Sequence, residues 1–290
     1  MRNLIWYLSL AAIGLIGAAY AIYNRRHTYK FSTLFVFYFA TAGLAWIFEF
    51  MVLGLLNSYA YKTGIFNDVW RQNLLGHLIL NTTVYPAVAV VMAAYSFKYK
   101  WAAFVSIMFT LIEYIYVNLR IYEQHWWRYY MTSVSAFVIL IIDSIWFDKI
   151  TRQCSRSVRV ITFYFVALLI VHTPAPILML LGKQYYYLKP ISDYYGNVYL
   201  ASIVIIFFYH VMECFLLIIC TCLLNKWYWR LIPFFVSVVV QSLLLKFDIL
   251  IFTNGWKLIY TLIVYETFIG IYTAVEGYTL KELNKKSNIM

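Results

Sequence analysis

The sequence predicts an all-α polytopic transmembrane bundle of about nine helices, forming one integral-membrane domain over residues 1–290. Hydrophobic residues make up 64% of the chain and charged residues 12%, whereas soluble domains carry about 25% charged residues. The mean hydropathy is +0.74. Apolar runs last about 20 residues, as a membrane-spanning helix requires, whereas barrel strands alternate over only about ten. The composition therefore excludes a soluble domain and a β-barrel.

Nine apolar segments account for most of the chain and are predicted to cross the membrane in order. They are Asn3–Ile22, Phe31–Leu55, Leu78–Phe97, Trp101–Leu119, Tyr130–Phe147, Val160–Leu181, Val198–Leu224, Leu231–Phe252 and Lys257–Gly277. The fourth and fifth segments are near the lower limit of length. The last two form a tight hairpin, so eight spans remain an alternative to nine.

The distribution of lysine and arginine predicts an outside N-terminus and a short cytoplasmic tail, residues 279–290. With this orientation every inner connection is basic, whereas most outer connections also contain an acid. The inner basic residues are Arg25, Arg26, Lys30, Lys98, Lys100, Lys149, Arg152, Arg156, Arg159, Lys226, Arg230, Lys281, Lys285 and Lys286. The net charge of +11 is thus scattered over short loops and forms no stripe, so nucleic acid is not an expected partner.

Ionisable residues in the apolar segments are the strongest functional candidates, because a charge at membrane depth costs several kcal/mol unless it is paired or hydrated. The predicted outer layer holds Glu49, Glu113, Lys246 and Asp248. The layer near the midplane holds His172, His210, Glu213 and Glu266. Asp143 and Glu276 lie toward the inner side. Each layer is interpreted as a binding region, with interhelical pairing that fixes the bundle as the alternative.

The predicted outer loops are rich in tyrosine and tryptophan, including Trp126 and Trp127 in the run 122–130. An aromatic belt at the membrane interface explains such residues. A rim that contacts a ligand is the alternative, because these side chains combine apolar area with one hydrogen bond. Tyrosine and tryptophan are more frequent in the outer loops than in the inner ones, so Trp126 and Trp127 are kept as candidate binding residues.

Metal and cofactor chemistry is not expected from the motifs. His210 and Glu213 share one helix face, but di-iron bundles use repeated Glu-x-x-His pairs, and here a single pair occurs in reversed order. The chain has no P-loop, His-Glu-x-x-His or Gly-x-Ser-x-Gly motif. The prediction is no metal site and no cofactor, with a hydrogen-bonded His–Glu pair instead.

Residues 45–95 resemble a family of uncharacterised multi-pass membrane proteins of spore-forming Firmicutes. The resemblance is carried by Phe48-Glu49-Phe50, Asn57-Ser58-Tyr59-Ala60-Tyr61, Gly64-Ile65, Asp68-Val69-Trp70, Gly76-His77 and Tyr85-Pro86. No catalytic residue or substrate is implied, since no activity is assigned to that family. The resemblance implies a Gram-positive plasma membrane.

A looser similarity is to the small integral-membrane terpene cyclases, which are also compact, aromatic-rich and polytopic. That similarity implies catalytic roles for Glu49 and Glu113, since a desolvated carboxyl group can act as an acid. Aromatic faces would stabilise the resulting carbocation. No segment of the chain aligns with these enzymes, so this is an analogy between folds.

Three classes of function follow. The first is a protein that binds or moves a small molecule or lipid through an outward-opening polar cavity lined by carboxylates and aromatics. The second is an enzyme acting on a lipid or isoprenoid, with Glu49 and Glu113 as general acids. The third is an accessory subunit whose buried charges dock partner helices. Expected partners are membrane lipids and a small apolar or lipid ligand; the oligomeric state stays open.

Overall fold

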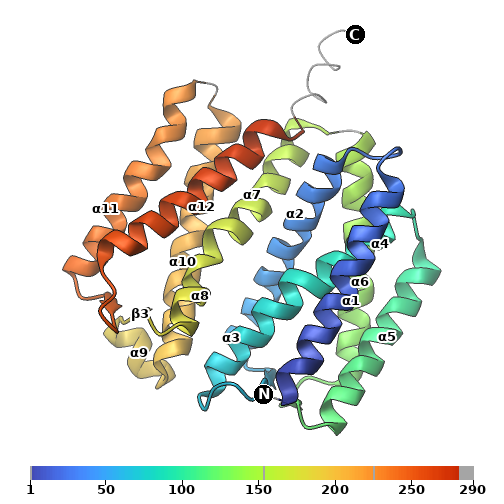
Figure 1. Cartoon of the computed structure of the whole chain (residues 1–290), viewed down its shortest axis with the longest axis horizontal. Coiled ribbons are helices and arrows are strands. Elements are labelled where there is room, and N and C mark those ends of the chain that lie inside the picture. Colours follow the sequence, from blue (N-terminus) through green and yellow to red (C-terminus); the bar gives the residue numbers. More distant parts are fainter. Residues whose placement is uncertain (1, 153, 225, 281–290) are drawn as a thin grey trace. The chain divides into compact units, whose positions relative to one another are not determined.

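The computed structural model describes residues 2–152, 154–224 and 226–280 (Figure 1). Over these ranges, nine helices are long and apolar enough to cross a membrane, which confirms the predicted all-α polytopic bundle. The contacts group the chain into two compact units, Met1–Val158 and Arg159–Met290, where the sequence predicted one domain. Most of the tail predicted from residue 279 lies outside the described residues.

Unit 1 contains the first five spans. Its helices are α1 (Arg2–Arg25), α2 (Phe31–Glu49) continued by the π-helical η1 (Phe50–Leu55), α3 (Val69–Ile79) continued by the π-helical η2 (Leu80–Val84) and by α4 (Tyr85–Ala94), α5 (Tyr99–Asn118) and α6 (Tyr129–Arg152). The third span begins earlier than the predicted Leu78. Asp68 caps it there, because its side chain accepts a hydrogen bond from the backbone N–H of Arg71 at 2.8 Å.

Unit 2 contains the remaining spans. Its helices are α7 (Arg156–His172) with α8 (Pro174–Leu180), the short α9 (Lys189–Tyr195), α10 (Val198–Ile218) with the π-helical η3 (Ile219–Leu223), η4 (Trp227–Leu231) with α11 (Ile232–Lys246), and α12 (Leu258–Tyr278). The eighth span was predicted to reach Phe252 but ends at Lys246. The apolar residues beyond it form a strand, so hydropathy alone extended the helix too far.

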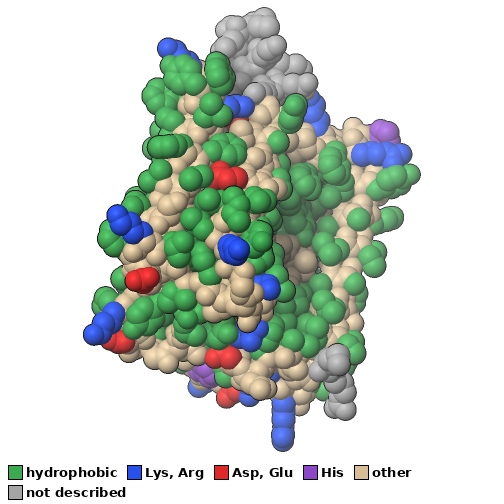
Figure 2. All heavy atoms as spheres, turned by 60° about the vertical axis from the view of Figure 1, so that its left-hand side comes forward, with side chains coloured by type: hydrophobic (Ala, Val, Ile, Leu, Met, Phe, Trp, Pro, Cys, Tyr) green, Lys and Arg blue, Asp and Glu red, His purple; other side chains and the backbone are tan. Residues whose placement is uncertain are grey.

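Large hydrophobic side chains are exposed along the spans, as expected of helices that face lipid. Ile13, Met212 and Phe235 are 68%, 67% and 71% exposed. Figure 2 shows hydrophobic side chains over most of one face of the molecule. Apolar surface of this extent is unfavourable in water and is accommodated by hydrocarbon.

The four spans of unit 2 repeat the last four spans of unit 1 in the same order. The first pair, Phe31–Leu55 and Arg156–Leu180, has 25 residues in each member. The second pair, Val69–Ala94 and Val198–Leu223, has 26 in each, and the third, Tyr99–Asn118 and Trp227–Lys246, has 20 in each. The fourth pair has 24 residues in Tyr129–Arg152 and 21 in Leu258–Tyr278. The helix α1 stands outside this repeat.

The loops repeat as well, because each unit pairs two short antiparallel strands. In unit 1, β1 (Tyr59–Tyr61) pairs with β2 (Tyr122–Gln124), and in unit 2, β3 (Gln184–Tyr186) pairs with β4 (Leu250–Phe252). In both sheets the last residue of the first strand lies opposite the first residue of the second. The second residue before each strand also has a positive φ, and these residues are Asn57, Arg120, Gly182 and Asp248.

Side-chain hydrogen bonds occupy matching places in the two repeats. The N–H of Tyr61 donates to Asn73 Oδ1 at 2.8 Å, and the N–H of Tyr186 donates to Ser202 Oγ at 2.8 Å. The indoles of two tryptophans each donate to a threonine five residues later: Trp127 to Thr132 at 2.6 Å and Trp256 to Thr261 at 2.9 Å. The chain therefore contains a direct repeat of a four-span unit, a plan known from membrane transporters.

Candidate functional site

Unit 1 encloses a cavity of about 220 Å³ at the end where its two strands pair. Asn3, the second residue of α1, lies at the same end, because its side-chain amide donates to the carbonyl of Lys62 at 2.9 Å. The lining residues are Leu10, Glu49, Tyr59, Tyr61, Leu80, Asn81, Val84, Tyr85, Phe109, Ile112, Glu113, Tyr116, Tyr122, Trp127, Thr132, Ser135, Ala136 and Ile139. Both carboxylates proposed from the sequence as catalytic, Glu49 and Glu113, therefore share one cavity.

Glu49 accepts a hydrogen bond on each oxygen from a tyrosine of β1. The hydroxyl of Tyr59 donates to Oε2 at 2.7 Å and that of Tyr61 donates to Oε1 at 2.8 Å. Burial raises the pKa of both phenols well above their ordinary value of 10.0, and the neighbouring carboxylate raises it further. Both phenols therefore keep their protons and act as hydrogen-bond donors to the carboxyl oxygens of Glu49.

Glu113 has a different environment. It is 7% exposed, and its Oε1 accepts a hydrogen bond from Gln124 Nε2 at 2.8 Å. Its Oε2 is buried and makes no hydrogen bond of regular geometry with the described residues, although the hydroxyl of Thr132 lies close enough to interact with the carboxyl group. A buried carboxylate oxygen without a regular hydrogen bond is unfavourable unless a proton or a ligand meets it. Glu113 is thus the carboxylate of the cavity that is available to a ligand.

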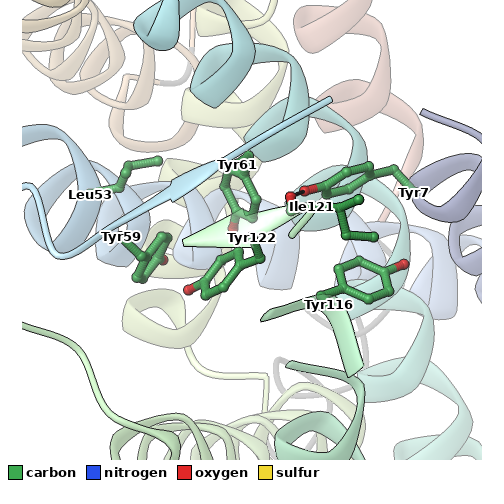
Figure 3. Close-up of a cluster of buried hydrophobic side chains, with 7 residues drawn as sticks. All are labelled: Tyr7, Leu53, Tyr59, Tyr61, Tyr116, Ile121 and Tyr122. Carbon is green, nitrogen blue, oxygen red and sulfur yellow. Dashed lines mark hydrogen bonds between the residues drawn. The ribbon is translucent and has the colours of Figure 1, made fainter. Parts of the chain in front are cut away.

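Five buried tyrosines hold the two strands against the helices (Figure 3), and all of them except Tyr7 line the cavity. The ring of Tyr59 lies 5.6 Å from that of Tyr61 and 5.1 Å from that of Tyr122. Tyr7 of α1 joins the cluster by donating its hydroxyl proton to the carbonyl of Ile121. Trp127 extends it, with its ring 5.8 Å from Tyr59. The rings present a continuous aromatic surface to the cavity.

One π-helical segment lines the same cavity, and a second begins next to a lining residue. The segment η1 begins directly after Glu49, and η2 contributes Leu80, Asn81 and Val84 to the lining. The widened turn of η2 is held by the hydroxyl of Tyr38, which donates to the carbonyl of Thr82 at 2.6 Å. π-helical turns are often found at functional sites, because they displace side chains from the regular helical positions.

Lys246 and Asp248 do not belong to a buried outer layer, contrary to the sequence-based placement. Both side chains are exposed. Lys246 is the last residue of α11, and Asp248 has φ +55 in the turn that leads to β4. The helix ends at Lys246, so this charge lies exposed at the end of its span, and Asp248 lies beyond the span.

The tryptophan pair divides between two environments. Trp127 lines the cavity, which is the position predicted for a residue that contacts a ligand. Trp126 is 43% exposed, and its indole donates to the carbonyl of Leu56 at 2.7 Å. Its role in the structure is to connect the two loops of unit 1.

The midplane candidates are brought together inside unit 2. His172 and His210 are buried, and their Nδ1 atoms lie 2.8 Å apart. His210 Nε2 lies 3.8 Å from Glu213 Oε2, which is too long for a hydrogen bond. Glu213 and Glu266 lie close enough for their carboxylates to interact. In the described part of the chain, no three His, Cys, Asp or Glu side chains are close enough to hold a metal ion together.

The carboxylates of the inner side are engaged in structural contacts. Asp143 accepts a hydrogen bond from the hydroxyl of Tyr85. Glu276 is 1% exposed and forms ion pairs with Arg159 and, at 2.9 Å, with Arg230. Sequence reasoning placed Arg159 in a loop and treated Lys246 as the cation within a span. Arg159 instead lies in the first turn of α7 and is 8% exposed. Hydropathy does not reveal whether a charged residue at the edge of a span is buried.

Several cavity residues were missed by sequence reasoning. Asn81, Thr132 and Ser135 line the cavity, but single polar residues in apolar segments carry no pattern that marks them. Gln124, the partner of Glu113, lies in a loop eleven residues away along the chain. Only the pairing of β1 with β2 brings that loop to the cavity.

The ion pair between Lys62 and Glu123 connects the two strands at the surface. The hydrogen bond from the Lys62 ammonium lowers the pKa of Glu123. A lowered folded-state pKa contributes stability above the ordinary value of 4.5, and this contribution is lost as the pH falls through the lowered value. We expect Glu123→Gln to reduce the unfolding free energy by less than about 1 kcal/mol, because both partners are exposed. Denaturant titrations should show this difference at pH 6 to 8 and its disappearance in acid.

Comparisons with known protein families, with curated proteins and with solved structures gave no match.

Proposed function

We propose that this multi-pass membrane protein binds, and moves, a small organic cation through the unit 1 cavity. The observation that carries the proposal is the composition of the lining: it contains two carboxylates, Glu49 and Glu113, and no lysine, arginine or histidine. Two carboxylates without a cationic side chain in an apolar surrounding favour a ligand that brings positive charge.

The aromatic surface supports the same ligand class. Tyr59, Tyr61, Tyr122 and Trp127 surround the carboxylates, and aromatic faces attract organic cations such as quaternary ammonium groups. The cavity volume of about 220 Å³ lies below the range of roughly 300–1,000 Å³ typical of drug-sized ligands. The predicted topology places the opening on the outer side. The resemblance of residues 45–95 to membrane proteins of Firmicutes supports a Gram-positive plasma membrane as its location.

The test is binding of choline and of its neutral isostere 3,3-dimethyl-1-butanol to the purified chain in nanodiscs, measured by calorimetry. We expect choline to bind and the isostere to bind at least about 10-fold more weakly, since it lacks the charge that the site recognises. Glu49→Gln should weaken choline binding by about 10-fold or more, because the charge-assisted partner is removed. Asp148→Asn, an exposed carboxylate of α6, is the matched control and should leave binding unchanged.

Equal binding of the two compounds, or undiminished choline binding by Glu49→Gln, would contradict a cation site. Mass spectrometry of molecules that co-purify with the protein provides an independent identification of the ligand. A neutral lipid recovered in stoichiometric amount would replace the cation as the proposed ligand.

The free oxygen of Glu113 favours a second candidate, an enzyme that protonates an isoprenoid or lipid. An acid must give up its proton in the cavity, and Glu113 Oε2 is the carboxylate oxygen there that makes no hydrogen bond of regular geometry with the described residues. Both oxygens of Glu49 instead accept hydrogen bonds from tyrosine hydroxyls, so Glu113 is the better candidate for the acid. Glu113→Gln should then abolish conversion of an isoprenoid epoxide without lowering the melting temperature. Unchanged lipid products in both proteins would exclude this chemistry.

A further inference from the structure

A second polar cluster lies inside unit 2, at the place that corresponds to the unit 1 cavity. Counted from the start of their spans, Gln241 occupies the position of Glu113, and His210 occupies that of Asn81. Tyr186 ends β3 as Tyr61 ends β1. The repeat therefore brings polar side chains to the same place in both units, but with different chemistry.

The cluster contains many buried polar atoms that make no hydrogen bond of regular geometry with the described residues. They are the hydroxyl of Tyr209, Nε2 of His210, both oxygens of Glu213, the hydroxyl of Ser237, both amide atoms of Gln241 and both oxygens of Glu266. Weaker contacts join Tyr209 to Glu213 and Gln241, and Ser237 to Glu266. Glu213, Ser237 and Gln241 are 5%, 1% and 0% exposed. Native proteins leave few buried polar groups unsatisfied, so a concentration of them in one place requires an explanation.

These side chains come from three packed helices and face one another. Glu213 of α10 interacts with Glu266 of α12 and with the neighbouring Tyr209. Ser237 of α11 lies beside Glu266, and Gln241 of α11 lies beside Tyr209. The hydroxyl, amide and carboxylate oxygens thus converge on one region in the interior of unit 2.

The donor set favours a hard cation. It consists of carboxylate, amide and hydroxyl oxygens, which are the ligands that Ca²⁺ prefers and that soft metals do not. Arg159 and Arg230 of unit 2 are already paired with Glu276, and among the described residues no lysine or arginine forms an ion pair with Glu213 or Glu266. One divalent cation would balance the charge of both carboxylates. We propose that Glu213, Glu266, Gln241 and Ser237 form a buried site for a divalent cation of the Ca²⁺ type.

The test is thermal unfolding of the purified full chain in detergent after removal of divalent ions with EDTA. CaCl₂, MgCl₂ and NaCl are then added separately at matched ionic strength. We expect Ca²⁺ to raise the melting temperature in a saturable way, because an ion that binds only the folded state stabilises it. Equilibrium binding of radioactive Ca²⁺ should show one ion per chain.

Glu266→Gln should lower the Ca²⁺ affinity by about 10-fold or more, since it removes one of two charged ligands. Ser237→Ala, a smaller change, serves as a second variant if the first fails to fold and should also weaken binding. Asp148→Asn, at an exposed carboxylate of α6 that belongs to neither site, is the control and should bind Ca²⁺ normally. The proposal is overturned if Ca²⁺ causes no shift, if Glu266→Gln and Ser237→Ala keep the full affinity, or if NaCl gives the same shift as CaCl₂.

Discussion

Glu276→Gln should destabilise the chain by about 3–5 kcal/mol, the largest effect expected of a single charge change in this protein. Glu276 is 1% exposed and holds two arginines at once. Arg230 has a side chain that is 31% exposed and can be hydrated when its partner is lost. Arg159 has a side chain only 10% exposed, so its charge would be left in an apolar surrounding.

The measurement is denaturant or thermal unfolding in one detergent, with Asp148→Asn as the control. Asp148 pairs with Arg152 at 3.4 Å, four residues along the same helix, and both side chains are exposed. This variant makes the same kind of change at the surface and should cost less than about 1 kcal/mol. If both variants unfold alike, the buried pairs of Glu276 do not stabilise unit 2.

Gly76→Ala should destabilise unit 1 by about 1–3 kcal/mol or more and should also weaken ligand binding in the cavity. A Cβ atom at residue 76 would lie 2.5 Å from Cγ and 2.6 Å from Cβ of Tyr61. These atoms are close to the backbone, so a side-chain rotation does not relieve the clash. The strand β1 must move away from α3, which stretches the hydrogen bond from Tyr61 to Glu49.

Gly270→Ala is the matched control, since it is the same substitution in a membrane-spanning helix. A Cβ at residue 270 meets no atom within 4 Å, and alanine favours the helix over glycine by up to about 1 kcal/mol. We therefore expect an unchanged or slightly higher melting temperature. Comparison of the two variants by thermal unfolding and choline calorimetry checks the prediction; wild-type binding by Gly76→Ala would show that the cavity does not depend on the position of Tyr61.

The four-span repeat is visible in the structure but not in the residue types of the sequence. No inverted repeat is apparent in the sequence. The repeat that exists is direct, and the residues at its equivalent polar positions differ in chemistry, as at Glu113 and Gln241 or at Asn81 and His210. The two copies of the repeat are recognised by their equal span lengths, their strand register and their backbone conformation. A comparison of residue types along the sequence does not detect these features.

The sequence by itself determined the membrane class, the nine spans and the presence of carboxylates within them. These are properties of consecutive residues, because each apolar run must match the bilayer thickness whatever its neighbours are. It also identified Glu49, Glu113 and Trp127 as candidate residues, and all three line one cavity. Only the tertiary structure decided which polar side chains meet: Gln124 reaches Glu113 from a distant loop, Arg159 pairs with Glu276, and Lys246 lies exposed at the end of its span. Such encounters depend on how helix faces and distant loops pack, and hydropathy contains no information about them.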